Sequence, residues 1–150
     1  MASKRVAILI SIFLWFTIPL NGWAEELAVI VNVKNPVGML GPAEIRKYFL
    51  KEHLAWDNGE KVRSVDRNGM TPERRIFLEK VIKLNDVELE QFWVSKRYEK
   101  GVPIPPKLGS DREVMEYVGS YDGAIGYVNS KSIGSLERSQ VKIISTIPLP

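Results

Sequence analysis

Cysteine is absent from this sequence of 150 residues, and histidine occurs once, as His53. Without cysteine the chain has no disulfide and no thiolate nucleophile, so a hydrophobic core must hold the fold together. One histidine and no cysteine are too few of the usual ligands for a zinc site. We therefore expect neither a bound metal nor a cofactor.

Catalytic motifs are also missing. The serine of Gly119–Gly123 follows the first glycine directly, whereas a nucleophile elbow needs the pattern Gly-x-Ser-x-Gly. His53 lies in a polar stretch and is interpreted as an ordinary surface residue. Glu88 and Glu90 belong to a predicted helix on which they point to different sides, so they do not form a catalytic pair. We predict that the protein is not an enzyme.

A strong net charge is the third absence. The chain has 21 lysine and arginine residues against 18 aspartate and glutamate residues. Without Lys4 and Arg5, which belong to the N-terminal segment described next, the balance is 19 to 18. Nucleic-acid binders carry a basic face, and this sequence shows none. We expect no nucleic-acid partner.

The N-terminal segment has the order of features of a secretory signal peptide. Lys4 and Arg5 precede an apolar run, Val6 to Leu20, and small residues stand three and one positions before a cut after Ala24. A membrane anchor is the alternative, but about 15 apolar residues fall short of the roughly 20 that span a bilayer. We predict a cleaved signal peptide over 1–24 and a periplasmic domain over 25–150. With no cysteine to carry a lipid, the mature protein should be soluble.

The mature chain alternates short apolar runs with helical patterns. Strands are predicted over 27–33, 62–65, 123–128 and 141–145, and helices over 43–50, from Thr71, from Asn85 or Asp86 to about Tyr98, and from Ser110. The first strand is apolar at nearly every position, as expected for a strand that is covered on both faces. This order predicts one α/β domain with a mixed or mainly parallel sheet flanked by helices.

One loop has the composition of an anion site. Residues 64–72 run from a strand end through a glycine turn to a helix N-terminus, where free backbone N–H groups and the helix dipole favour oxyanions. Arg67, Asn68, Gly69 and Thr71 are the candidate ligands, with the Arg67 guanidinium suited to a bidentate contact. The alternative is that Thr71 only caps the helix, Gly69 only turns the chain, and Arg67 is solvated. The two readings are equally supported by the residues.

A second helix start, at Ser110 and Asp111, is a weaker candidate. A capping box from Ser110 to Glu113 accounts for these residues, and the Asp111 carboxylate would repel an anion. Trp56 and Tyr127 are candidates for cleft aromatics, although core or edge packing is more common for such side chains.

Several segments, taken in order, resemble the phosphate ABC-transporter substrate-binding protein family. They are the strand Val29–Asn32 before Asn35-Pro36, the helix Glu44–Leu50, the stretch Ala55-Trp56-Asp57-Asn58-Gly59, and the strand Gly123-Ala124-Ile125-Gly126-Tyr127-Val128. The resemblance covers most of the mature chain. It implies a type 2 periplasmic-binding-protein-like fold, of which a chain this short supplies a single lobe.

The resemblance also implies a ligand and a site. Full members of the family have two lobes that close on phosphate, held by hydroxyls, backbone N–H groups and an arginine near a Gly-Ser-Gly-Thr turn. That turn maps here to Arg67 through Thr71. This chain departs from the pattern because the turn is shorter and Met70 stands where serine or glycine is expected.

Two functions follow from these observations. The first is an exported solute-binding protein that holds phosphate or a similar oxyanion and serves a membrane transporter of the ABC importer class. The second is a periplasmic interaction or structural module that keeps the fold without ligand capture and binds another periplasmic protein. In the first function Arg67, Gly69 and Thr71 converge on one anion. The second predicts a partner surface around the connector Pro103–Pro106 and the aromatic stretch Phe92-Trp93.

Overall fold

The computed structural model describes residues 24–150, so the predicted signal peptide lies outside the described residues apart from Ala24. The strands are β1 (Glu26–Asn32), β2 (Arg63–Ser64), β3 (Asp66–Arg67), β4 (Lys107–Leu108), β5 (Ala124–Asn129) and β6 (Val141–Pro148). The helices are α1 (Pro42–Phe49), α2 (Pro72–Phe77), the π-helix η1 (Leu78–Ile82), α3 (Asp86–Lys100), α4 (Asp111–Ser120), and the 3₁₀ turns η2 (Ser130–Ser132) and η3 (Glu137–Ser139).

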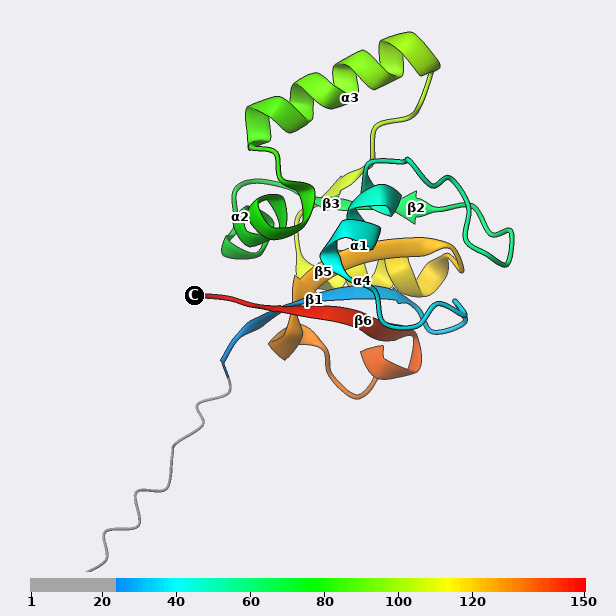
Figure 1. Ribbon diagram of the computed structural model, residues 1–150. Coiled ribbons are helices and arrows are strands. Elements are labelled where there is room, and N and C mark those ends of the chain that lie inside the picture. The colour runs from blue at the N-terminus through cyan, green and yellow to red at the C-terminus, as the bar shows by residue number, and fades with distance from the viewer. Residues whose placement is uncertain (1–23) are drawn as a thin grey trace, which may run out of the picture.

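The main sheet has four strands in the order β2-β5-β1-β6 (Figure 1). β1 pairs antiparallel with both β5 and β6, and only the short β2 runs parallel to its neighbour β5. The sheet is therefore mixed, as one form of the prediction stated, and the mainly parallel form is wrong. The reason is that β1 pairs with two antiparallel strands that are distant from it in the sequence. No local pattern in the sequence specifies the direction of such neighbours.

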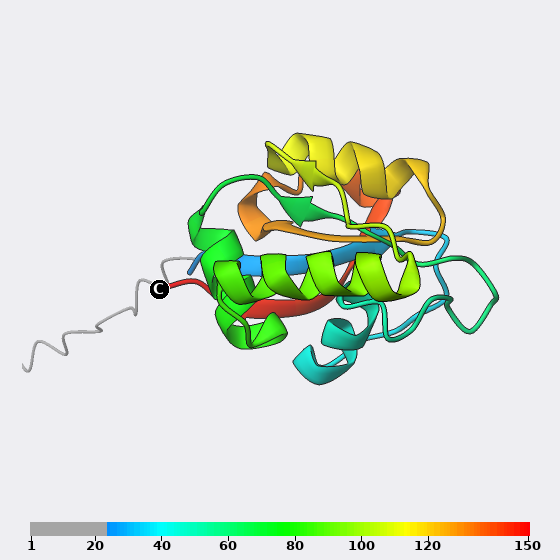
Figure 2. The same cartoon turned by 90° about the horizontal axis from the view of Figure 1, so that it is seen from above.

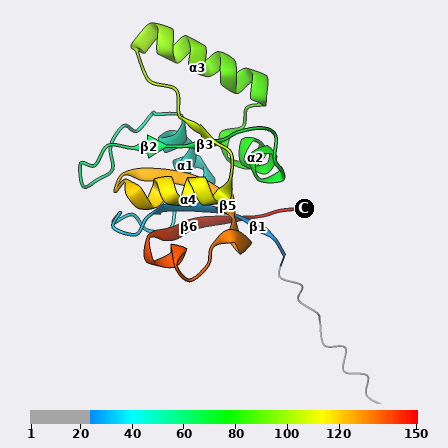
Figure 3. The same ribbon diagram turned by 180° about the vertical axis from the view of Figure 1, so that it is seen from behind.

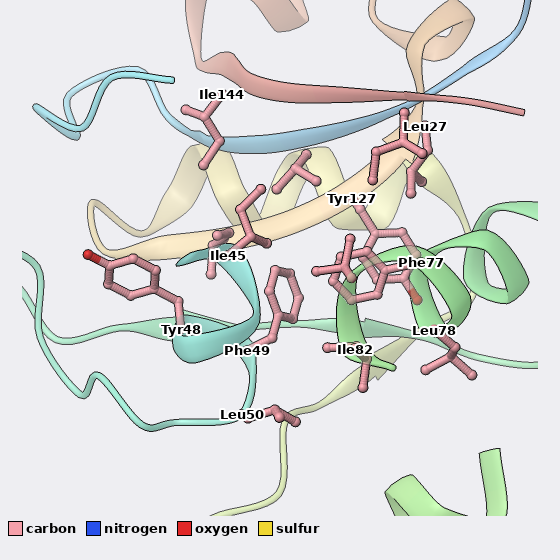
Figure 4. Packing of buried hydrophobic residues seen from close by; sticks show 14 of the residues in the cluster. Leu27, Ile45, Tyr48, Phe49, Leu50, Phe77, Leu78, Ile82, Tyr127 and Ile144 are labelled. Atoms are coloured by element: carbon pink, nitrogen blue, oxygen red, sulfur yellow. The ribbon is translucent and has the colours of Figure 1, made fainter. Parts of the chain in front are cut away.

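Helices cover both faces of this sheet. α4 lies on one face, and α1 and α2 lie on the other (Figures 2 and 3). Two hydrophobic clusters fill the spaces between these layers, one beneath α4 and a larger one beneath α1, α2, η1 and α3. In the larger cluster the rings of Phe49, Phe77 and Tyr127 lie against each other (Figure 4), and Phe77 stacks on Tyr127 at 4.0 Å. β1 is buried on both faces, as its unbroken apolar run predicts.

The glycines of the segment 123–128 lie at close approaches of the chain. A Cβ atom at Gly126 would lie 2.7 Å from a methyl group of Val114 in α4, and one at Gly123 would lie 2.1 Å from the carbonyl oxygen of Lys61. Neither distance leaves room for a side chain. Glycine at 126 therefore lets α4 pack directly on β5, and glycine at 123 lets β2 reach the sheet.

The helix starts agree with their capping residues. Thr71 accepts from the Arg74 N–H, Asn85 accepts from the Glu88 N–H in a full capping box, and Ser110 accepts from the Glu113 N–H. The box predicted at Ser110 is only half formed, because the Glu113 carboxylate accepts from the Gly109 N–H instead of the Ser110 N–H.

The predicted strand over 62–65 is observed as the short β2, and a second short strand, β3, follows it outside the predicted range. β2 joins the main sheet, and β3 turns away to pair in parallel with β4 in a small two-stranded sheet. This change of direction places Asp66 and Arg67 at the end of the domain where α2 and α4 begin. Within the described part of the chain, no helix has the length and apolar character needed to span a membrane.

Candidate functional site

The predicted anion loop joins β3 to α2. Arg67 ends β3, Gly69 turns the chain with a φ of 72°, and Thr71 caps α2. The strand, glycine turn and helix start therefore occur in the predicted order. The positive φ at Gly69 is a conformation that residues with a Cβ rarely adopt, so the glycine has a local structural reason.

Arg67 is buried, so the alternative in which its side chain is solvated is wrong. Its side chain is 7% exposed, and its Nη1 donates to the carboxylate of Asp111 at the start of α4. The buried Nε has no hydrogen-bond partner among the described residues. The backbone N–H of Arg67 donates to Asp66 at 2.8 Å and to the Tyr127 hydroxyl at 3.3 Å. The guanidinium is thus held in place, with part of its donor capacity unused.

A second buried arginine lies next to this site. Arg74, 2% exposed, donates from Nε and Nη2 to Asp66 and from Nη1 to Asp86. The Tyr127 hydroxyl also donates to Asp66, at 2.5 Å. Burial lowers the pKa of Arg74, but its hydrogen bonds to Asp66 and Asp86 and the negative charge of Asp66 raise it above the ordinary value. Burial, followed by the charge of Asp66, raises the pKa of Tyr127 well above its ordinary value.

The four predicted ligands do not share one contact partner. Arg67 is paired with Asp111, and the Thr71 hydroxyl accepts from the Arg74 N–H at 3.2 Å as a helix cap. Asn68 and Gly69 are exposed, and the Asn68 N–H donates to the carbonyl of Leu108 in the β3–β4 pair. Each residue therefore has a structural role, and their assignment as anion ligands stays a prediction.

The other candidates fall into the core or onto the surface. Trp56 and Tyr127 are buried, Trp56 with its indole N–H donating to the Gly123 carbonyl at 2.9 Å. His53 is exposed. Among the described residues there is no group of three side chains suited to hold a metal ion.

Sequence reasoning missed the partners of Asp111. Besides Arg67, its carboxylate accepts from the Asn129 backbone N–H at 3.2 Å and from the Ser132 hydroxyl at 2.6 Å. Arg67 lies in one segment, and Asn129 and Ser132 lie together in a second segment that is distant in the sequence. The only available signal was the opposite charge of Arg67 and Asp111, and such pairs of charges are too common to identify a contact.

The comparisons with known proteins concern the fold. No protein-family model matches the chain, and no curated protein matches it in sequence. Several solved structures do match, each covering 81% of this chain. An ABC-type phosphate transport receptor from Vibrio cholerae has a TM-score of 0.61 at 21% identity, with 46% of its own length covered.

Two further neighbours are of the same kind. A phosphate ABC transporter substrate-binding protein from Clostridium perfringens, solved with bound phosphate, has a TM-score of 0.60 at 19% identity, with 45% of that chain covered. PstS from Borrelia burgdorferi has a TM-score of 0.58 at 20% identity, with 47% covered. This chain therefore spans about half the length of these proteins. The predicted single-lobe fold of the phosphate-binding proteins is confirmed.

Proposed function

We propose that this protein is an exported, single-lobe solute-binding protein that binds phosphate or a similar oxyanion next to Arg67. The observation that carries the proposal is the buried guanidinium at the end of β3, directly before the glycine turn and α2. A guanidinium shielded from water attracts an oxyanion more strongly than a solvated one, because the local dielectric is lower. The position is also the one that the family resemblance assigns to the phosphate arginine.

Transport and location belong to the same proposal. The similar structures from Vibrio cholerae and Clostridium perfringens are named as phosphate transport proteins, which supports a periplasmic protein that passes its ligand to an ABC importer. The basic and apolar order of residues 1–24 supports export by a cleaved signal peptide.

A second candidate is a periplasmic interaction module without ligand capture. It is favoured by the ion pair between Arg67 and Asp111, which neutralises the cation that the first candidate needs. Its partner surface would include the outer side of α3, where Val94 and Tyr98 are 64% and 93% exposed. Exposed apolar side chains on one helix face are a common feature of protein-binding surfaces.

Calorimetry separates the two candidates. The full chain, expressed with its own leader and purified from the periplasm, is titrated with inorganic phosphate at low salt. Arg67→Met is measured beside it, and Arg75→Met is the matched control because Arg75 is an exposed arginine of α2. Saturable heat that is lost in Arg67→Met and retained in Arg75→Met supports oxyanion binding. No heat at millimolar phosphate from the folded protein contradicts it and favours the interaction module.

A further inference from the structure

The carboxylate of Asp111 is bound as an external oxyanion would be. It accepts from the guanidinium of Arg67 in β3, from the backbone N–H of Asn129 at the end of β5, and from the hydroxyl of Ser132 in η2. A guanidinium, a backbone N–H and a hydroxyl are the donor types that proteins direct at phosphate and related anions. We call Arg67, Asn129 and Ser132 the oxyanion cradle.

A second feature shows that the carboxylate does not use the cradle fully. The Arg67 side chain is more than nine-tenths buried, yet its Nε has no partner among the described residues. A buried N–H without an acceptor is unfavourable, and native structures contain few of them. A carboxylate offers two oxygens, whereas phosphate offers four, so a tetrahedral anion can engage donors that Asp111 leaves unpaired.

Asp111 is not needed for the start of α4. Ser110 caps that helix by accepting from the Glu113 N–H at 3.2 Å, and Glu113 closes the preceding turn by accepting from the Gly109 N–H. Asp111 contributes a favourable charge near the helix N-terminus but no capping hydrogen bond. Its side chain, 18% exposed, lies at the rim of the domain and not within the core. The carboxylate can therefore leave the cradle without unwinding α4.

We propose that the oxyanion cradle is a binding site for phosphate-like anions and that Asp111 occupies it as an internal competitor. The inference rests on the proposed function and names the donors and the competing group of that site. An intramolecular carboxylate is present at the cradle at a high effective concentration, so an external anion has to displace it. Asn129 and Ser132, which the sequence did not single out, become ligands once Asp111 is displaced.

The surrounding charges set the direction of the effect. The Asn129 side-chain amide donates to Glu73 and Glu25, at 3.2 and 3.1 Å, and Lys131 pairs with Glu25 at 2.9 Å. With Asp111 ionised, the three carboxylates outnumber Arg67 and Lys131, and an incoming dianion is repelled. Removal of the Asp111 charge balances the group and frees the place next to Arg67.

The test titrates inorganic phosphate into the full chain and into Asp111→Ala at low salt. We expect the affinity of Asp111→Ala to be higher by about tenfold or more, because both a competitor and a repulsive charge are removed. Asp122→Ala is the matched control, since it removes an exposed aspartate whose partner is Lys34 and should leave the affinity unchanged. Adding Ser132→Ala to Asp111→Ala should lower the affinity again by severalfold, because one donor of the cradle is lost.

The outcomes separate this inference from the proposed function. Phosphate binding by the unaltered chain that Asp111→Ala does not tighten overturns the inference and leaves the proposed function standing. Heat from Asp111→Ala alone supports the cradle and overturns ligand capture by the unaltered chain. No heat from either folded protein overturns both. Circular dichroism checks folding, and Asp111→Asn, which removes the charge but keeps the size of the side chain, should raise the affinity by a smaller factor and replaces the alanine variant if that variant does not fold.

Discussion

The two buried arginines of this domain lie in neighbouring segments and have different surroundings. Arg74 directs all three of its nitrogens to carboxylates, two of them to Asp66 and one to Asp86. Arg67 uses only Nη1, toward Asp111, and its Nε is buried without a partner. Both side chains are almost fully buried, so exposure alone does not distinguish them. Their hydrogen bonds do.

The difference shows that Arg74 holds elements of the fold together, whereas Arg67 keeps a donor without a partner among the described residues. Arg74 connects α2 to β3 and α3, and each of its three nitrogens already donates to a carboxylate. Its partner Asp66 is also bound by the Tyr127 hydroxyl from β5, so the cluster joins four elements. Arg67 is bound by one carboxylate at the rim of the domain. The pairing of Arg74 with two carboxylates stabilises the fold, whereas the unpaired Nε of Arg67 is the feature on which the proposed anion site depends.

The largest expected effect is on the Arg74 bridge. Arg74→Met leaves the mostly buried carboxylate of Asp66 without its cation, and we expect a loss of about 3–5 kcal/mol in the free energy of unfolding. Arg67→Met should lose less, about 1–3 kcal/mol, because its partner Asp111 keeps two other donors at the surface. Urea unfolding measures both, and Arg75→Met, at an exposed position, should change stability by no more than about 0.5 kcal/mol. Equal losses for Arg74 and Arg67 would remove the distinction between them.

A smaller effect is expected from the Tyr127 hydroxyl. Tyr127→Phe keeps the ring stacked on Phe77 and removes the hydrogen bond to Asp66, at a loss of about 1–3 kcal/mol. The pKa of Tyr127 is raised in the folded protein, so its neutral form contributes stability that is complete below the unfolded pKa of about 10. That contribution is lost as the pH rises from there through the folded pKa. Urea unfolding at pH 8 and above pH 10 should therefore show the difference between the two proteins narrowing, and a constant difference would be contrary to this account.

The smallest effect concerns Thr71, which is a helix cap in the structure and an anion ligand in the sequence-based prediction. Thr71→Ala should lower stability by about 1 kcal/mol, and Thr71→Ser, which keeps the hydroxyl, should restore most of it. Ser110→Ala, at the cap of α4, provides a matched loss of the same kind. If Thr71 only caps α2, phosphate affinity is equal in the two Thr71 variants. An affinity lost in Thr71→Ala and kept in Thr71→Ser would make Thr71 a ligand and extend the site beyond the cradle.

The helix starts and the buried strand could be predicted because their causes are local. Thr71, Asn85 and Ser110 each cap a helix through a bond to a residue three positions along the chain. The apolar run of β1 likewise predicts that the strand is buried, and Gly123 and Gly126 lie where segments of the chain pack closely. The motifs that resemble phosphate-binding proteins depend on the same local segments, and the fold that they imply is confirmed by structures that are no more than 21% identical.

The candidate site was predicted less completely. The sequence located Arg67 in the correct strand–turn–helix connection but could not assign its partner, because Arg67 and Asp111 are 44 residues apart. It also treated Asp111 as a charge that repels anions, whereas the structure shows its carboxylate accepting hydrogen bonds from Arg67, Asn129 and Ser132. The direction of the strands next to β1 could not be predicted either, because the same apolar pattern fits parallel and antiparallel neighbours.

By itself the sequence determined the fold class, the order of the main strands and helices, the starts of the helices and the loop in which Arg67 lies. These properties depend on residues within a few positions of each other, where capping bonds, turns and apolar periodicity operate. Only the tertiary structure decided that Arg74 is a closed bridge and that Arg67 shares the carboxylate of Asp111 with Asn129 and Ser132. The reason is physical: a charge is satisfied by whichever opposite charge the folded chain brings within hydrogen-bond distance, and many acids along the sequence were equally eligible.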